Sequence, residues 1–378
     1  YIGVGEGEDV QIFYLFVESQ RNPFIDPLLL WLVGGPGCSA LSAFFFENGP
    51  LVMDDNYSGD LPKLELNPYA WSHTLNMMYI DVPVGTGFSY SETQEGYYSS
   101  DILWVEHTYE LLQKWFIDHP KFRSNPFYIG GGSYSGITTG PLVHKVYEGY
   151  VARREPLINI KGYVLASPNV DTYHDFNMKV LYAYQRSLIP ETLYKSMKEN
   201  CNDSYINIDP ENTKCVSDYE AYSEVSINSA LLDVCNIYLV YSYIMVSITC
   251  MKTNSLHKRA TNYGASLCYY AWCESRNPTK SSRISSSNIL SYYHILVDAW
   301  ANDENVRKAL HVREGTKEEF LRCNRSLAYT TTRLSTVEYY RNLTHANLEA
   351  LGAGHVAQTF KPKEVYNLIN RWFSYSLI

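Results

Sequence analysis

The feature that most constrains the fold is a short apolar segment that leads into a glycine-rich turn and then into a helix. Pro126 to Ile129 has the composition of a buried strand, Gly130 to Ser133 that of a tight turn, and Gly136 to Tyr147 the apolar spacing of a helix. A serine in such a strained turn is exposed above the edge of a sheet. The order of strand, turn and helix therefore predicts an α/β fold and makes Ser133 a candidate nucleophile.

Other segments repeat this alternation of buried strand and helix. Leu28 to Val33 is a continuous apolar run that stops at the turn Gly34 to Gly37, and Met77 to Val82 is a second such run. Asp101 to Asp118 carries apolar residues at helical spacing, and Lys161 to Ala166 has the composition of another buried strand. Because parallel strands are joined by crossover helices, the alternation predicts a mostly parallel central sheet.

The alternation stops near Val170 and resumes near Ala299, which predicts three segments. Residues 1–170 and 289–378 form the two parts of the α/β core, and residues 171–288 form an insertion, or cap, subdomain. The insertion holds six of the eight cysteines, so we expect it to be helical and to carry disulfides. In the last segment, Asn302 or Asp303 can cap a helix, and Pro362 to Ser374 predicts a closing helix.

Charge and hydropathy exclude several classes of partner. The net charge is −9 and no long basic run occurs, so nucleic acid and an anionic membrane surface are poor partners. The most apolar run, Ile237 to Met251, is shorter than the roughly 20 residues that a membrane-spanning helix needs. We therefore expect no membrane anchor, and a small organic substrate or a peptide is the favoured partner.

Cysteines and N-glycosylation sequons together favour the secretory pathway. Four sequons begin at Asn56, Asn202, Asn324 and Asn342, and eight cysteines accompany them. The chain opens on Tyr1 without a basic region or an apolar leader, so we expect it to start after processing or trimming. The predicted location is secreted or vacuolar, with sugar on the four asparagines.

Four ordered motifs resemble the serine carboxypeptidase-like family. They are Gly-Gly-Pro-Gly-Cys-Ser at 34–39, Asp81-x-Pro-Val-Gly-Thr-Gly-Phe-Ser-Tyr-Ser to Ser91, Gly-Gly-Ser-Tyr-Ser-Gly to Gly136, and Gly352-Ala-Gly-His355. Asn67-Pro-Tyr69, Trp300-Ala-Asn-Asp303 and Arg322-Cys-Asn324 extend the resemblance over nearly the whole chain. It implies an α/β-hydrolase fold that uses no metal and no cofactor.

The resemblance also assigns roles to individual residues. Ser133 attacks an acyl carbonyl, His355 accepts its proton, and the backbone N–H groups of Gly35 and Tyr134 form the oxyanion hole. Three disulfides are implied, and two cysteines have no partner in the family pattern. The pairs are Cys38 with Cys323, Cys201 with Cys215, and Cys235 with Cys268, which leaves Cys250 and Cys273.

Two substitutions separate this chain from carboxypeptidases of the family. Those enzymes bind the terminal carboxylate of a peptide with an Asn and a Glu, where this chain has Val33 and Gly132. Of the implied carboxylate-binding groups only Glu47 is present. The stretches around Ser133 look more like the plant acyltransferase branch, which moves an acyl group from a glucose ester to an alcohol.

A further departure concerns the carboxylate that orients the catalytic histidine. The family supplies it from a Gly-Asp-x-Asp turn, but no Asp occurs between Asp303 and His355, and the segment from Asn236 to Asn262 also departs from the family pattern. Loss of this carboxylate costs about 10⁴ in kcat in serine proteases. Three functions therefore remain open: an impaired acyltransferase, a serine carboxypeptidase, and a catalytically silent member of the family.

Overall fold

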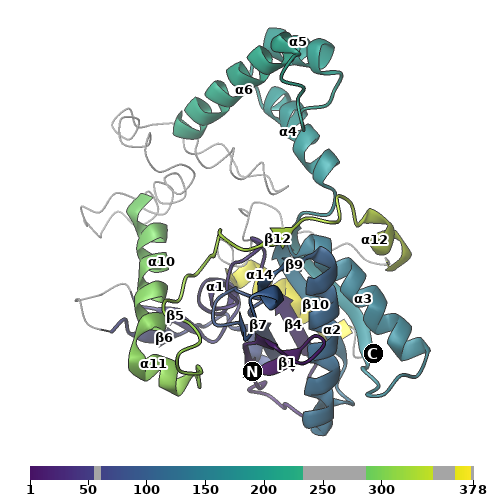
Figure 1. Cartoon of the computed structure of the whole chain (residues 1–378), viewed down its shortest axis with the longest axis vertical. Coiled ribbons are helices and arrows are strands. Elements are labelled where there is room, and N and C mark those ends of the chain that lie inside the picture. Colours follow the sequence, from purple (N-terminus) through teal and green to yellow (C-terminus); the bar gives the residue numbers. More distant parts are fainter. Residues whose placement is uncertain (55–60, 233–286, 344–361, 376–378) are drawn as a thin grey trace. The chain divides into compact units, whose positions relative to one another are not determined.

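The protein forms two compact units. The computed structural model describes residues 1–54, 61–232, 287–343 and 362–375 (Figure 1). Described residues of the first unit lie within Tyr1–Val170, His294–Ala350 and Val356–Ile378, and those of the second unit lie within Asp171–Tyr293. The expected division into residues 1–170, 171–288 and 289–378 stays a prediction. Residue 288 lies within a continuous helix, α10 (Ser287–Asn302).

A five-stranded sheet forms the centre of the first unit, in the order β11-β10-β4-β7-β3. The pairs β11/β10, β10/β4 and β4/β7 are parallel, and only β3 runs antiparallel to its neighbour. The expectation of a mostly parallel sheet is thereby confirmed. The strands are β3 (Tyr14–Val17), β4 (Leu28–Leu32), β7 (Asn76–Ile80), β10 (Phe127–Ser133) and β11 (Ile160–Pro168).

Helices lie on both faces of this sheet. Alternate residues of each strand point to opposite faces, so each strand contributes side chains to both layers of helices. Phe127 and Ile129 of β10 belong to the apolar core formed with α2 (Asp101–Asp118) and α3 (Gly136–Val151). Tyr128, between them, packs against Phe373 of α14 (Pro362–Tyr375), with ring centroids 4.8 Å apart. Strands β4 and β7 and most of β10 are buried, as their continuous apolar runs require, whereas the edge strands β3 and β11 are mostly half-buried.

Strand β10 extends further than its sequence indicated. The glycines expected to form a turn from Gly130 continue the strand, and Gly130 pairs with Trp31 of β4 and Val164 of β11. A methyl group at Gly130 would lie 2.9 Å from the Trp31 ring. The glycines are required by close packing within the sheet, and the turn begins only at Ser133.

Helix ends follow local capping. Ser100 accepts a hydrogen bond from Leu103 N at the start of α2, and Asp303 accepts hydrogen bonds at the start of α11 (Glu304–Ala309). Of the two residues expected to cap a helix here, Asn302 and Asp303, it is Asp303 that caps α11 and separates it from α10. The remaining short elements of the first unit are β1 (Ile2–Val4), β2 (Val10–Ile12), α1 (Leu41–Phe46), β5 (Leu51–Met53), β6 (Leu64–Leu66), β8 (Tyr90–Ser91), β9 (Ser99–Ser100), β12 (Tyr329–Thr330) and α12 (Val337–Leu343).

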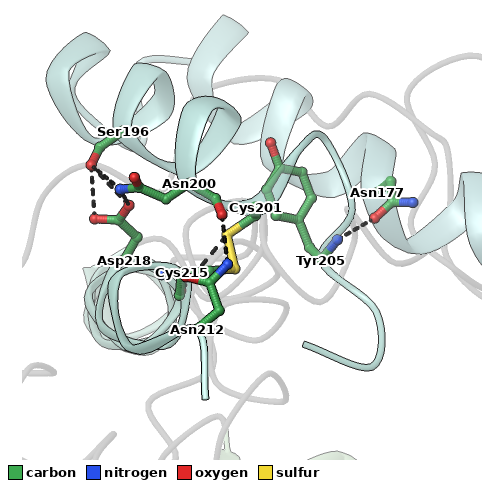
Figure 2. Close-up of a disulfide and its surroundings, with 8 residues drawn as sticks. All are labelled: Asn177, Ser196, Asn200, Cys201, Tyr205, Asn212, Cys215 and Asp218. Carbon is green, nitrogen blue, oxygen red and sulfur yellow. Dashed lines mark hydrogen bonds between the residues drawn. A yellow bond between two sulfur atoms is a disulfide. The ribbon is translucent and has the colours of Figure 1, made fainter. Parts of the chain in front are cut away.

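The second unit is helical in its described part, as expected for the insertion. It contains α4 (Thr172–Gln185), α5 (Glu191–Cys201) and α6 (Thr213–Leu232). The disulfide Cys201–Cys215 joins α5 to α6, and Asp218 accepts hydrogen bonds from Ser196 and Asn200 beside it (Figure 2). The two helices are therefore joined both covalently and by a half-buried polar network.

None of the helices in the described ranges is long and apolar enough to cross a membrane. The apolar run Ile237 to Met251 and the divergent segment from Asn236 to Asn262 lie outside the described residues.

Candidate active site

Ser133 lies at the junction between β10 and α3, with its backbone in the left-handed region at φ +58°. A non-glycine residue there costs of order 1–3 kcal/mol and persists only where the surroundings enforce it. The carbonyl of Ser133 accepts a hydrogen bond of 2.8 Å from Asn169 N, just beyond β11. The side chain is partly exposed. This geometry is that of a nucleophile elbow, in which the turn presents Oγ above the end of the strand.

Ser135 stabilises the elbow from the inside. Its hydroxyl is 2.8 Å from the carbonyl of Gly132 and 3.2 Å from that of Leu32, at the end of β4. A methyl group at Gly131 would lie only 2.3 Å from Ser135 Oγ, so the glycine makes room for this hydroxyl. Ser135 stands where the common elbow sequence Gly-x-Ser-x-Gly has its last glycine. Its hydroxyl thus links the ends of β10 and β4 by hydrogen bonds.

The glycine turn after β4 lies directly against the elbow. A methyl group at Gly34 would be 2.7 Å from Ser133 Cβ and 2.7 Å from the backbone nitrogen of Tyr134. Gly35 follows with φ +124° and is exposed. The two backbone segments expected to supply the oxyanion hole are therefore adjacent, and Gly34 permits their close approach.

The far side of this turn is tied to residues 322–324. Cys38 and Cys323 form a disulfide with Cα atoms 3.9 Å apart. Ser39 N donates to the carbonyl of Arg322 at 2.7 Å, and Asn324 N donates to the carbonyl of Gly37 at 2.9 Å. The turn that carries Gly35 is thus anchored by a covalent bond and by backbone hydrogen bonds on both sides of it.

Asp81 joins the same turn to the end of β7. Its carboxylate accepts hydrogen bonds from Ser39 Oγ at 2.7 Å, from Ala40 N at 2.8 Å and from Phe88 N at 2.8 Å. Complete burial raises the pKa of Asp81 to about 6, although these hydrogen bonds and the charge of Lys317 oppose the shift. Asp81, which begins the motif that ends at Ser91, therefore has a structural role. It holds the segment after the glycine turn, at Ser39 and Ala40, against the segment at Phe88.

Val33 and Gly132 are neighbours at the ends of β4 and β10, one position beyond the pair Leu32 and Gly131. Both are partly exposed, and neither offers a polar side-chain atom. Glu47 lies at the end of α1, where its carboxylate accepts a hydrogen bond of 2.8 Å from Trp31 Nε1. The carboxylate that the sequence assigned to substrate binding therefore has a partner within the protein.

Several expected residues lie outside the described residues or carry no described side chain. His355, Asn56, Cys235, Cys268, Cys250 and Cys273 are outside the described ranges, and Asn342 is described only as part of the backbone of α12. Within the described ranges, no group of three or more His, Cys, Asp or Glu side chains could hold a metal ion. The structure brings together Ser133, Tyr134, Gly132, Val33 and the Gly34–Gly35 turn at one end of the parallel sheet.

A serine in a left-handed elbow between a parallel strand and a helix, with a glycine turn against it, defines an α/β hydrolase. A solved structure shares this fold: Kex1(delta)p, a prohormone-processing carboxypeptidase from Saccharomyces cerevisiae, aligns with a TM-score of 0.56 at 19% identity over 83% of this chain and 62% of that one. Residues 1–351 match the serine carboxypeptidase family, Peptidase S10. The chain is 40% identical to serine carboxypeptidase-like 10 and 39% identical to serine carboxypeptidase-like 9 of Arabidopsis thaliana, over 90% of its own length and 69% and 70% of theirs. The protein belongs to the serine carboxypeptidase family.

Proposed function

We propose that this protein transfers acyl groups through an ester at Ser133, from a glucose-ester donor to an alcohol acceptor. Ser133 Oγ bonds to the acyl carbon, its proton passes to His355, and the bond to the glucose oxygen breaks as glucose takes that proton. The acceptor hydroxyl then attacks the acyl-serine and gives its proton to His355, which passes a proton to Ser133 Oγ as the bond between the acyl carbon and that oxygen breaks. The backbone N–H groups of Gly35 and Tyr134 stabilise the oxyanion in both steps.

The observation that carries this proposal is the contact between the glycine turn and the elbow. Gly34 allows the turn to approach Ser133 and Tyr134 so closely that a single methyl group would clash with both. Such an approach is needed where two backbone donors must converge on one oxygen atom, about 2.7–3.1 Å from each. An ordinary glycine-rich connection has no need of it.

Ester donors are favoured over peptides by what surrounds the serine. A terminal carboxylate must be matched by donors or positive charge, since burial without a partner is costly. Val33 and Gly132 supply neither, and the carboxylate of Glu47 already accepts from Trp31. A neutral acyl group meets no such cost, so an uncharged glucose ester fits the surroundings formed by Val33, Gly132 and Glu47 better than the charged end of a peptide does.

The absent Asp-bearing segment favours a second candidate, a catalytically silent member of the family. Without a carboxylate, the tautomer and the orientation of His355 are not fixed, and turnover is expected to fall about 10⁴-fold. The acyltransferase proposal therefore predicts trace turnover, whereas the silent candidate predicts none that depends on Ser133. The serine carboxypeptidase alternative predicts a preference for peptides.

One experiment separates the three functions. The purified chain and its Ser133→Ala variant are assayed with a 1-O-acyl glucose ester plus an alcohol acceptor, and with a blocked dipeptide. The expected result is slow transfer from the glucose ester that exceeds peptide hydrolysis and disappears in the variant. The reverse preference would establish the carboxypeptidase, and identical traces from both proteins would establish the silent protein.

We further propose that the protein resides outside the cytosol, in a secreted or vacuolar location. The described disulfides Cys38–Cys323 and Cys201–Cys215 support this, because such bonds persist in oxidising compartments. Detection of the native chain in a vacuolar or extracellular fraction, with a mass that shows bridged cysteines, tests it.

A further inference from the structure

A buried carboxylate outside the expected site converges on the residue that follows the nucleophile. Asp101, the first residue of α2, has no exposed surface. Its Oδ1 accepts hydrogen bonds from the hydroxyls of Tyr134 at 2.7 Å and Tyr329 at 2.6 Å. Its Oδ2 accepts from the backbone nitrogens of Thr332 at 2.5 Å and Arg333 at 2.8 Å. This side chain thus joins the elbow to a segment about 200 residues further along the chain.

The ring of Tyr134 is fixed along its whole length. It stacks on Trp104 of α2 with centroids 6.2 Å apart and an interplanar angle of 21°, and it meets the edge of Tyr329 at 6.1 Å. Strand β12 places Tyr329 there by pairing with β9, directly before Asp101. The hydroxyl of Tyr134 donates to Asp101 at 2.7 Å and also lies 3.2 Å from Thr331 Oγ1, so Asp101 is the nearer of its two partners.

Both hydroxyls donate to Asp101 at neutral pH. Burial raises the pKa of Tyr134 to about 12, and it raises the pKa of Tyr329 still further, with additional effects of the neighbouring carboxylate and phenol. The two phenols therefore keep their protons, and both donate them in hydrogen bonds to Asp101 Oδ1.

Resting on the function proposed above, we propose that Asp101 is a positioning residue for acyl transfer, which fixes the peptide N–H of Tyr134 by holding the tyrosine hydroxyl. The backbone nitrogen of Tyr134 belongs to the same residue as the anchored ring and faces Gly34. A ring held at its far end restricts rotation of the Tyr134 backbone, and hence the direction of its N–H. An oxyanion donor acts only if it is aimed before the charge develops.

A different role must be distinguished, in which Asp101 only ties α2 to residues 329–333. That role predicts lower stability on mutation without a specific effect at the elbow. Asp26 provides a matched control, because it is also buried and accepts from Ser19 Oγ at 2.6 Å and Asn22 N at 2.9 Å, and it pairs with Arg21. It is part of the same unit but has no contact with the elbow among these hydrogen bonds.

The test uses the rate at which a fluorophosphonate labels Ser133, together with hydrogen–deuterium exchange of the peptide that spans residues 130–137. In labelling, the serine oxygen bonds to phosphorus as fluoride leaves, and the developing charge needs the same oxyanion donors. Asp101→Ala and Tyr134→Phe are expected to slow labelling about 10- to 100-fold, as for a misaligned catalytic group. The double variant should be no slower than the slower single variant, because both changes remove one interaction.

Asp101→Asn is the conservative variant. Its Oδ1 can accept from the nitrogens of Thr332 and Arg333 while its Nδ2 donates to both tyrosine oxygens. A tyrosine hydroxyl can accept a hydrogen bond as well as donate one, so both contacts can be kept. It should keep most of the labelling rate, and Asp26→Ala should keep all of it despite a comparable loss of thermal stability. Equal losses for Asp26→Ala and Asp101→Ala would overturn the proposal.

Hydrogen–deuterium exchange tests the inference even if the protein has no catalytic activity. Should the native protein neither turn over nor label at Ser133, the acyltransferase proposal fails. The positioning role still predicts at least about tenfold faster exchange in residues 130–137 for Asp101→Ala and Tyr134→Phe, but not for Asp26→Ala. Unchanged exchange in that peptide would then overturn it.

Discussion

The indole N–H of Trp31 donates a 2.8 Å hydrogen bond to the carboxylate of Glu47. Trp31 has no exposed surface, and its ring meets Trp71 edge-on at 5.0 Å, so the indole cannot turn to another partner without repacking the core. The carboxylate of Glu47 therefore contributes to the stability of the fold, whether or not a substrate is bound.

Replacement of Glu47 should therefore affect stability in a manner that depends on the new side chain. Glu47→Ala leaves a buried indole N–H without its acceptor, which costs about 1–3 kcal/mol. Glu47→Gln keeps an acceptor oxygen and should cost less than half as much. Urea unfolding of both variants measures the difference, and equal losses would show that charge, not the hydrogen bond, is what matters at this position.

Asp81 should make the protein less stable as the pH rises from about 4 to 6. Burial raises its pKa from 3.8 to about 6, so the folded state binds a proton that the unfolded state has already released. Stability is highest below the unfolded pKa, falls through this window, and is then lower by about 3 kcal/mol. Asp81→Asn should flatten this slope in urea unfolding at pH 4, 5, 6 and 7. A variant with the native slope would contradict the assignment to Asp81.

Gly34→Ala should disable the site more than it disables the fold. The new methyl group would meet Ser133 Cβ and Tyr134 N, both at 2.7 Å, and neither atom belongs to a flexible side chain. Overpacking of this kind costs about 1–3 kcal/mol, and relief requires the elbow to move. Labelling of Ser133 should fall at least about tenfold.

Gly162→Ala on β11 is the control for this substitution. Its methyl group would lie 3.4 Å from the Tyr128 ring, an ordinary contact, and Gly162 has no left-handed backbone. It should label at the native rate. Equal labelling by Gly34→Ala and Gly162→Ala would show that the turn does not need to approach the elbow so closely.

Local patterns in the sequence were enough to predict the parallel strands β4, β7, β10 and β11 and the position of Ser133 between a strand and a helix. Helix α2 was predicted with the bounds that the structure has, because Ser100 caps it and Pro120 cannot continue it. Ser133 follows from the order of strand, turn and helix. The glycines of β10 were assigned to a turn, because nothing local reveals that the Trp31 ring occupies the space beside Gly130.

Contacts between distant segments could not be predicted in this way. Asp101 was identifiable only as the start of a helix, since its partners Tyr329 and Thr332 lie more than 200 residues away in the sequence. Trp31 and Glu47 lie only 16 residues apart, yet nothing in the sequence around either residue indicates that they form a hydrogen bond. A sequence pattern places a side chain on an element, but its hydrogen-bond partner depends on the tertiary packing.

The sequons at Asn202 and Asn324 should differ in occupancy. Asn202 is exposed at the C-terminal end of α5, in the left-handed conformation. Asn324 Nδ2, the atom that would carry sugar, donates to the carbonyl of Gly85 at 3.1 Å, and its Oδ1 accepts from Ser326 N at 2.9 Å. Glycopeptide mapping of the protein from a secretory host should find sugar on Asn202 and none on Asn324. Full occupancy of Asn324 in folded protein would contradict this.

The last prediction concerns the attempt to restore peptidase activity through Val33→Asn and Gly132→Glu. A Cβ at residue 132 would lie 3.1 Å from the Ala166 carbonyl, a tight contact that a shift of a few tenths of an ångström between β10 and β11 would relieve. The two new side chains would return an amide donor and a carboxyl group, which donates to a peptide carboxylate only when it is protonated, but not the carboxylate that orients His355. Binding and proton transfer are separate requirements, so the double variant should bind a dipeptide more tightly without recovering kcat.

Insertion of a segment with the Gly-Asp-x-Asp turn of the family pattern, between Asn324 and Gly352, supplies the missing group. It should raise Ser133-dependent turnover of the glucose ester by up to about 10⁴-fold in the otherwise native chain. Peptide hydrolysis should increase by a comparable factor only where the insertion is combined with the double variant. If the double variant alone hydrolyses the dipeptide rapidly, another carboxylate of this chain already orients the histidine, because substrate binding cannot replace proton transfer.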